Sequence, residues 1–329
     1  MNMLNKQVSV LTPKKIFDEI SKTIVGQTKA KRVISNAMYL HLVKLLDYSV
    51  EKEVNPNATM KNKSNVLLMG PSGCGKTYLV RTAVQAIRDL VGIEIFPLLE
   101  IDSTGVTAKG WKGDDIDEII GDFYKNKLGG NKELFSTAII YMDEFDKMAI
   151  PAIGTGGTDH NKTAQYSLLK LVEGKDVETK GEGAFATSDI INTSNVLFIF
   201  AGNFLDVRSK RKDTGSKLGF THNNLHEAIV NHHEALIETG VVTELVGRIG
   251  YTAELEQLTK EELVQILVTH VVPDTERLLH LVGIDLQSKI TEFEKIAENA
   301  IKRGTGARGL DVELLSALEE EIFNSSFNL

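Results

Sequence analysis

A glycine-rich loop between an apolar strand and a helix limits this chain to a small group of folds. The strand is predicted at residues 66–69 and the helix at residues 78–90. The loop between them consists of Gly70, Pro71, Ser72, Gly73, Cys74, Gly75, Lys76 and Thr77. Glycines let backbone N–H groups point at phosphates, Lys76 supplies positive charge to the β and γ phosphates, and Thr77 offers a hydroxyl to Mg²⁺. The loop therefore predicts a P-loop for ATP and Mg²⁺, and we count the next residue, Tyr78, among those that bind the nucleotide.

A second motif follows the apolar run 139–142, where Asp143 and Glu144 end a predicted strand. Asp143 is predicted to hold Mg²⁺ together with Thr77, directly or through water. Glu144 is predicted to polarise the attacking water, since phosphoryl transfer depends on positioning and on stabilising charge. An acidic turn after a strand is common by itself, but its place downstream of a P-loop favours a Walker B motif.

The chain alternates short apolar runs with helical segments, which is the pattern of a parallel α/β sheet. The apolar runs are residues 66–69, 93–101, 138–142 and 196–201, and helices are expected from about residue 13 to residue 50. After Leu255 the apolar strands stop, and Thr259 and Glu262 form a capping box before a helical pattern. A chain of 329 residues exceeds what one core usually organises. The sequence therefore predicts two domains, residues 1–254 and 255–329.

Charge and cysteine content indicate which cellular compartment and which kind of partner to expect. The formal net charge of −8 argues against a surface built to neutralise phosphates, so nucleic acid is not the expected partner. Cys74 is the only cysteine, which excludes an intrachain disulfide and a Cys-based zinc site and favours a reducing compartment, the cytoplasm. No apolar run approaches the roughly 20 residues of a membrane span, and neither a signal peptide nor an anchor is expected.

The P-loop and the segment 143–147 (DEFDK) together resemble the AAA+ unfoldases ClpX and HslU of the Clp/Hsp100 family. The resemblance covers nearly the whole chain. It implies an α/β P-loop AAA+ fold, in which helices flank a parallel five-stranded sheet, and a smaller C-terminal helical lid domain that carries sensor 2. It also implies that Ile24 and Val25, in the segment IVGQ, pack on adenine.

Three further residues inherit catalytic roles from this resemblance. Arg308, in the segment GARGL, matches sensor 2, whose arginine reaches the nucleotide from the small domain. Arg248, in TELVGR, matches an arginine finger that enters the neighbouring subunit's site, which implies a homo-hexameric ring. Asn203 follows the run 196–201 and suits a polar sensor 1 that orients the lytic water, although ClpX usually has a small apolar residue there. Without the flanking motifs, each arginine would be interpreted as a surface cation or a structural ion pair.

Gly110, Trp111, Lys112 and Gly113 resemble the aromatic pore loop of these motors. A large ring between glycines can grip an extended polypeptide through contact area, so Trp111 is predicted to contact protein substrates. The alternative is that this only tryptophan is a core anchor, but the adjacent lysines and the acidic run after it favour exposure. A second pore loop is expected at residues 150–160, which contain the run GTGG.

Leu218, Gly219 and Phe220 resemble the ClpX loop that docks into the ClpP peptidase, a loop that HslU lacks. They predict a ClpP-type peptidase as a partner, and a buried turn is the alternative. The chain departs from ClpX in two respects, because no N-terminal zinc-binding domain is expected and residues 175–194 lack the basic segment of the family's pore entrance. Substrate choice is therefore expected to differ.

Two polar clusters have ordinary explanations beside the functional ones. His222 and His226 have the i, i+4 spacing of a metal-binding helix face, with His232 and His233 nearby, but a solvated surface is favoured. The basic run 208–212 could contact nucleic acid or an acidic protein rim, and a solvated loop is favoured.

The sequence thus predicts an ATP-hydrolysing protein unfoldase and translocase that threads polypeptides through a ring. A DNA-directed AAA+ ATPase and a nucleotide-gated assembly scaffold are the alternatives. The presence of Glu144, Arg248 and Arg308 disfavours the scaffold, because a scaffold needs no catalytic groups.

Overall fold

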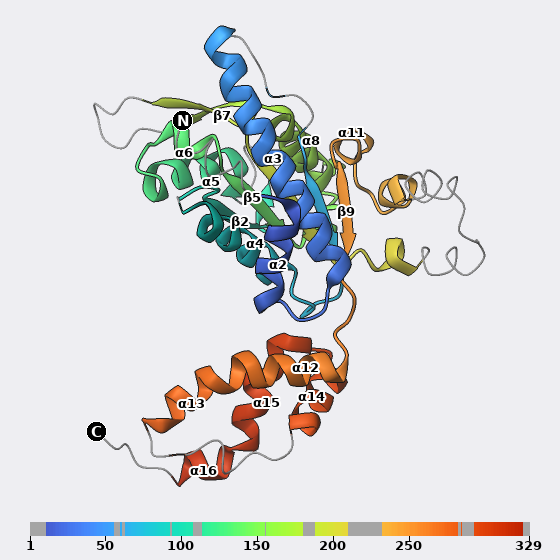
Figure 1. The fold of residues 1–329 in the computed structure, drawn as a ribbon. Helices are drawn as coiled ribbons and strands as arrows, with labels where there is room; N and C mark the ends of the chain where they lie inside the picture. The colour runs from blue at the N-terminus through green and yellow to red at the C-terminus, as the bar shows by residue number, and fades with distance from the viewer. Residues whose placement is uncertain are drawn as a thin grey trace, which may run out of the picture.

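The computed structural model describes residues 11–55, 60, 63–92, 94–107, 114–154, 156–179, 188–209, 232–281, 284 and 293–324. Its centre is a five-stranded parallel sheet with the strand order β2-β5-β8-β1-β9 (Figure 1). The strands are β1 (Val66–Met69), β2 (Leu98–Asp102), β5 (Ile139–Asp143), β8 (Leu197–Gly202) and β9 (Tyr251–Glu254). The predicted parallel sheet of five strands is confirmed.

Two strands differ from the apolar runs of the sequence. The run 93–101 becomes a strand only at its end, because Arg88 donates to Ile95 O (2.9 Å) and Phe96 O (3.0 Å) and Phe96 has a positive φ of 56°. A guanidinium rather than a neighbouring strand binds these carbonyls. Strand β9 does not form an apolar run, because it lies at the sheet edge and only Ala253 of its residues is buried.

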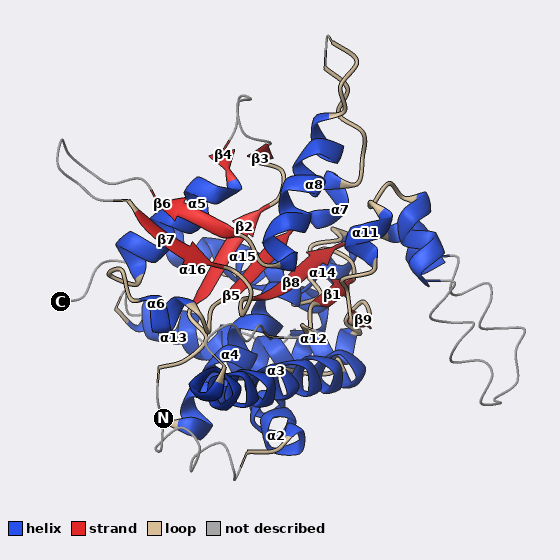
Figure 2. Cartoon of the chain, turned by 90° about the horizontal axis from the view of Figure 1, so that it is seen from above, coloured by secondary structure: helices blue, strands red, loops and turns tan. Residues whose placement is uncertain are grey.

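Helices cover both faces of the sheet (Figure 2). One face packs against α2 (Pro13–Thr23), α3 (Thr28–Val54) and α4 (Lys76–Val91). The other face packs against α5 (Ile116–Asp122), α7 (Phe145–Met148) and α8 (His160–Glu173). Along β1, Val66 and Leu68 belong to the first core while Leu67 and Met69 belong to the second, as the alternation of strand side chains requires.

Short elements complete the sheet-containing part of the chain. Two strand pairs are β3 (Val106–Thr107) with β4 (Asp114–Asp115), parallel, and β6 (Asp176–Thr179) with β7 (Asp189–Asn192), antiparallel. The short helices are η1 (Phe123–Lys127), α6 (Lys132–Phe135) and α11 (Thr243–Val246). The second pore loop expected at residues 150–160 includes an isolated bridge between Ile153 and Asp159, and both Ile150 and Ile153 are exposed.

The C-terminal region is helical and has a core of its own (Figure 1). Its helices are α12 (Lys260–Ile266), η2 (Leu267–Val271), α13 (Val272–His280), α14 (Phe293–Lys302), η3 (Gly306–Gly309), α15 (Leu310–Ala317) and α16 (Glu319–Phe323). The capping box is present, since Thr259 Oγ1 accepts from Glu262 N and Glu262 Oε2 accepts from Thr259 N. We propose a domain boundary close to the predicted one after Glu254, because Leu255 still belongs to a core of the sheet and the buried residues of the C-terminal core all lie between Leu258 and Leu318.

Several predicted residues lie outside the described ranges. They are the pore-loop residues Gly110, Trp111, Lys112 and Gly113, the docking residues Leu218, Gly219 and Phe220, and the histidines His222 and His226. Within the described residues, no group of three or more His, Cys, Asp or Glu side chains is arranged to hold a metal ion. No helix in the described part of the chain combines the length and apolar content that crossing a membrane needs.

Candidate functional site

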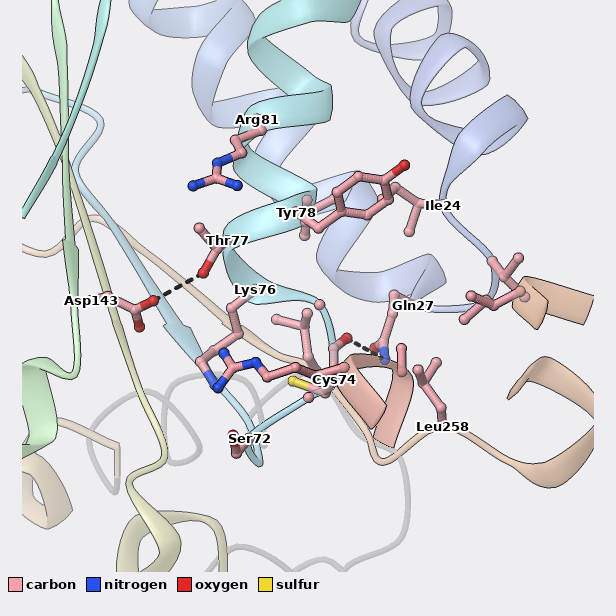
Figure 3. Close-up of a pocket in the computed structure, with 18 of the residues that line it drawn as sticks. Ile24, Gln27, Ser72, Cys74, Lys76, Thr77, Tyr78, Arg81, Asp143 and Leu258 are labelled. Atoms are coloured by element: carbon pink, nitrogen blue, oxygen red, sulfur yellow. Dashed lines mark hydrogen bonds between the residues drawn. The ribbon is translucent and has the colours of Figure 1, made fainter. Parts of the chain in front are cut away.

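A cavity of about 750 Å³ opens where the carboxyl ends of β1, β5 and β8 meet the C-terminal helical region. Ligands of parallel α/β sheets bind at this end of the strands. Figure 3 shows residues that line the cavity, with Thr77 and Asp143 toward one side and Ile24, Gln27 and Leu258 toward the other. The cavity thus has a polar end at the sheet and an apolar end next to the C-terminal region.

The P-loop forms the polar end and has the backbone that its glycines predict. Gly73 and Gly75 have φ values of 74° and 94°, which L-residues rarely adopt. Gly75 is the N-cap of α4, so the loop leads directly into a 16-residue helix whose N-terminus faces the cavity. Lys76 Nζ donates to Gly70 O (2.8 Å) and Pro71 O (3.0 Å), which keeps the ammonium over the loop.

Thr77 and Asp143 lie next to each other at the polar end of the cavity, the arrangement that the sequence predicts for a magnesium site. Thr77 Oγ1 donates to Asp143 Oδ2 at 2.9 Å and lies 3.1 Å from Tyr141 Oη (Figure 3). Burial raises the pKa of Tyr141 far above its ordinary value, so its phenol stays protonated. A hydroxyl and a carboxylate are the hard oxygen ligands that Mg²⁺ prefers, and the pair fits the ion.

Glu144 follows Asp143 and lines the same cavity. Its backbone is left-handed with φ 53°, and its N–H donates to Asp143 Oδ1 at 2.9 Å. A non-glycine residue in this conformation is uncommon and is found at functional sites, where it aims a side chain. The side chain is exposed to the cavity, where a general base needs to reach water.

Asn203 follows β8 directly and also lines the cavity. Its Oδ1 accepts from Arg208 Nη1 at 3.0 Å, and Arg208 Nε donates to Glu254 Oε1 at 3.0 Å. Arg208 is buried, so the prediction that the run 208–212 is entirely a solvated loop is wrong for this residue. The carboxylate of Glu254 in β9 balances the charge of Arg208. This pairing cannot be predicted from the basic run alone.

The apolar end joins residues that are distant in the sequence. Ile24 and Val25 line it, as predicted, together with Leu258 and His270 of the C-terminal region. Gln27 fastens the two parts, because its Nε2 donates to Glu256 O (2.8 Å) and its Oε1 accepts from Glu256 N (3.0 Å). No local sequence pattern indicates a role for Gln27, Leu258 or His270 in the cavity, since their contacts depend on how the two parts pack.

The two predicted arginines occupy different places. Arg308 lines the cavity from η3, within reach of the P-loop, since Ala307 N donates to Gly73 O at 3.2 Å. Arg248 does not line this cavity, and its Nε (3.1 Å) and Nη2 (2.5 Å) donate to Glu173 Oε1 at the end of α8. The structure therefore brings Arg308 to the chain's own pocket and leaves Arg248 outside it.

The remaining predicted residues surround the same loop. Ser72, Cys74 and Tyr78 line the cavity, and Tyr78 is 48% exposed. Cys74 is buried, and this burial raises the pKa of its thiol, which makes it a weak nucleophile at neutral pH. Gly70 and Pro71 do not line the cavity but supply the carbonyls that hold Lys76.

Comparison with known proteins identifies the class of ATPase to which this chain belongs. The model of the ATPase family associated with various cellular activities (AAA) matches residues 66–211, which include the P-loop, Asp143, Glu144 and Asn203. Together with the relatives described next, this match makes the protein an AAA ATPase, which binds a nucleotide and hydrolyses ATP.

Similarity over nearly the whole of this chain identifies a particular family within the AAA ATPases. Proteins named ATP-dependent Clp protease ATP-binding subunit ClpX from Treponema denticola and Azotobacter vinelandii are 31% and 32% identical to this chain. The matches cover 93% and 95% of this chain and 75% and 74% of the relatives. A ClpX of Borrelia duttonii is 30% identical over 95% of this chain and 74% of its own length. The chain belongs to the ClpX family, and the resemblance expected from the motifs is confirmed.

Proposed function

We propose that this ATPase is a protein unfoldase and translocase that threads polypeptides through the pore of a homo-hexameric ring. The observation that carries the proposal is the nucleotide pocket, which is bounded on one side by the sheet and on the other by the C-terminal helical region. A ligand that touches both parts shifts their packing, and a change of nucleotide becomes a change of shape. The ClpX family membership supports protein as the substrate that this movement acts on.

Hydrolysis in the pocket uses groups from four strand and helix ends. Lys76 and the N-terminus of α4 bind the phosphates, and Arg308 adds charge from η3. Thr77 and Asp143 would hold Mg²⁺, which supplies charge neutralisation to the phosphates when bound. Glu144 polarises the attacking water and Asn203 orients it.

Assembly completes the site. Arg248 is 55% exposed in its side chain and points to Glu173 rather than into the chain's own pocket, which supports a role in a neighbouring subunit. An arginine supplied in trans stabilises transition-state charge only where subunits meet, so hydrolysis depends on the ring.

Substrate contact and partner docking rest on the family resemblance. Trp111 grips the polypeptide, and Leu218, Gly219 and Phe220 dock a ClpP-type peptidase, in keeping with the relatives' name as subunits of the Clp protease. The exposed Ile150 and Ile153 give the second pore loop an apolar contact surface. A cytoplasmic location, expected from the single cysteine, stays a prediction.

The test is ATP-dependent loss of fluorescence from a tagged, folded protein substrate. Wild type is expected to unfold it, while Trp111→Ala retains ATPase activity but loses unfolding. The matched control is Phe323→Ala, which removes an exposed aromatic side chain from the C-terminal helical region. This variant should unfold substrate like wild type. Addition of ClpP should produce peptides only with Leu218, Gly219 and Phe220 intact.

Unfolding that is unchanged in Trp111→Ala would overturn the threading proposal. ATPase activity that rises with DNA and not with unfolded protein would favour the DNA-directed alternative. Slow hydrolysis that is unaffected by Glu144→Gln would favour the assembly scaffold.

A further inference from the structure

Arg208 is the buried arginine whose two contacts join the end of β8 to the end of β9. Its side chain is 10% exposed, and that of its partner Glu254 is 16% exposed. Nη1 donates to Asn203 Oδ1 and Nε donates to Glu254 Oε1, both at 3.0 Å. Asn203 lines the nucleotide cavity, whereas neither Arg208 nor Glu254 does.

We propose that Arg208 is a positioning residue for ATP hydrolysis, which fixes the orientation of the Asn203 amide toward the bound nucleotide. Arg208 acts through Asn203 and does not contact the nucleotide itself. The inference rests on the proposed role of Asn203 in orienting the lytic water beside the γ phosphate.

The direction of the amide follows from the chemistry of the guanidinium. An arginine side chain has only N–H donors, so the Asn203 atom that faces it has to be the acceptor, Oδ1. The Nδ2 group, with two protons, is then the part of the amide that can donate to the contents of the cavity. A γ-phosphate oxygen accepts such a donor, whereas the opposite orientation would bring Oδ1 against the phosphate and repel it. Arg208 thus selects the orientation that binds a triphosphate.

Burial makes this selection strong. A charged donor in a low-dielectric setting forms stronger hydrogen bonds than one in water, and Glu254 supplies the opposite charge that makes burial of the guanidinium tolerable. Glu254 is also held in place as the last residue of β9, where Leu255 N donates to Met69 O at 2.7 Å. Arg208 is therefore held by the sheet through Glu254, and its position does not depend on whether a nucleotide is bound.

The experiment measures kcat and KM for ATP hydrolysis, affinity for a fluorescent ADP analogue, and the melting temperature. The variants are Asn203→Ala, Arg208→Met and the double variant. Arg208→Met is expected to lower kcat about tenfold or more, as misplacement of a catalytic group does, with ADP affinity unchanged because ADP has no γ phosphate. The double variant should have the kcat of Asn203→Ala alone, because Arg208 has nothing left to position.

Arg88→Met is the matched control. Arg88 is another partly buried arginine that binds two oxygens, those of Ile95 and Phe96, but it lies outside the cavity. Its loss should lower the melting temperature without lowering kcat of the folded enzyme. If Arg208→Met does not fold, Arg208→Lys replaces it, since lysine keeps the charge beside Glu254 but lacks the fork that contacts both partners.

Three outcomes would overturn the inference. The first is a wild-type kcat in Arg208→Met, or in Arg208→Lys where that variant replaces it. The second is a double variant in which Arg208→Met lowers kcat by the same factor as in wild type, which would mean that Arg208 acts independently of Asn203. The third is a wild-type kcat in Asn203→Ala, which would remove the proposed role of Asn203 as well. In the first two cases a reduced kcat in Asn203→Ala leaves that role standing.

Discussion

Individual residues at the phosphate end of the pocket are held by neighbours that fix the direction of their side chains. Asp143 receives the Thr77 hydroxyl through one oxygen and the Glu144 N–H through the other. Glu144 itself sits in a left-handed backbone that turns its side chain toward the cavity. The Glu144 carboxylate, unlike that of Asp143, is not used to hold neighbouring groups in place. Its loss should therefore affect catalysis and not the stability of the fold.

Glu144→Gln is therefore expected to lower kcat for ATP hydrolysis by about 100-fold or more, since general-base catalysis contributes at least that much. The amide keeps the shape of the side chain but cannot take up a proton, so ATP binding and the melting temperature should stay at wild-type values. Steady-state ATPase rates beside binding of a fluorescent ATP analogue check this. A variant that hydrolyses ATP at the wild-type rate would contradict the assignment of Glu144 as the base.

Lys63 is a partly buried residue outside the nucleotide cavity, and its charge is expected to affect stability. Its Nζ donates to Val172 O (2.7 Å) and Thr193 O (2.8 Å), and burial lowers its pKa to about 7. An unfolded lysine has a pKa of about 10.4, so between these values the unfolded chain binds a proton that the folded chain does not. Stability from this group is therefore lowest below about pH 7 and rises with pH across that window.

Removing Lys63 should flatten that dependence. In urea unfolding, the free energy of unfolding of Lys63→Met is expected to rise less than that of wild type from about pH 7 to about pH 9. Lys170→Met removes an exposed lysine from α8 and should retain the wild-type rise. Equal slopes in wild type and Lys63→Met would show that the ammonium is accommodated without a desolvation cost.

At the scale of helices and strands, the sequence predicts what a local pattern determines. The strand that precedes the P-loop, the helix that follows it and the capping box at Thr259 are all confirmed. The edge strand β9 and the hydrogen bonds of Gln27 to Glu256 depend on partners that are distant in the sequence. The irregular backbone at Phe96 depends on Arg88, eight residues earlier, through a contact that no periodic pattern indicates. Arg208 shows the same limit within the site, because its partner Glu254 is 46 residues away.

The contribution of the capping box to the stability of α12 can be measured by substitution. Thr259→Ala removes the hydroxyl that accepts from Glu262 N and should destabilise α12 by about 1 kcal/mol. Thr269→Ala is the matched control, because its hydroxyl donates only to Gln265 O one turn earlier in the same helical segment. Calorimetry of both variants, with amide exchange in α12, gives the comparison. Equal melting temperatures for the two variants would mean that the cap does not stabilise the region.

For the whole molecule, the separation of Arg248 from its own pocket makes a prediction about mixed rings. Arg248→Ala subunits keep an intact pocket, and Glu144→Gln subunits keep an intact Arg248. Mixing the two variants should restore part of the ATPase rate, because a pocket of one kind can meet an arginine of the other. The rate is measured against each variant alone at the same total concentration. If mixtures are no faster than the sum of the variants, Arg248 does not act in trans.

The contact between the P-loop and η3 has a consequence for how the motor can be dissected. A Cβ at Gly73 would collide with Thr305 O, and Ala307 N donates to Gly73 O at 3.2 Å. Both of these contacts join main-chain atoms of the phosphate-binding loop to main-chain atoms of the C-terminal region. Shortening side chains to alanine would leave this hydrogen bond in place, whereas Gly73→Ala would place a Cβ against Thr305 O and force the two parts of the chain apart. An ester in place of the Ala307 amide would remove the hydrogen bond alone.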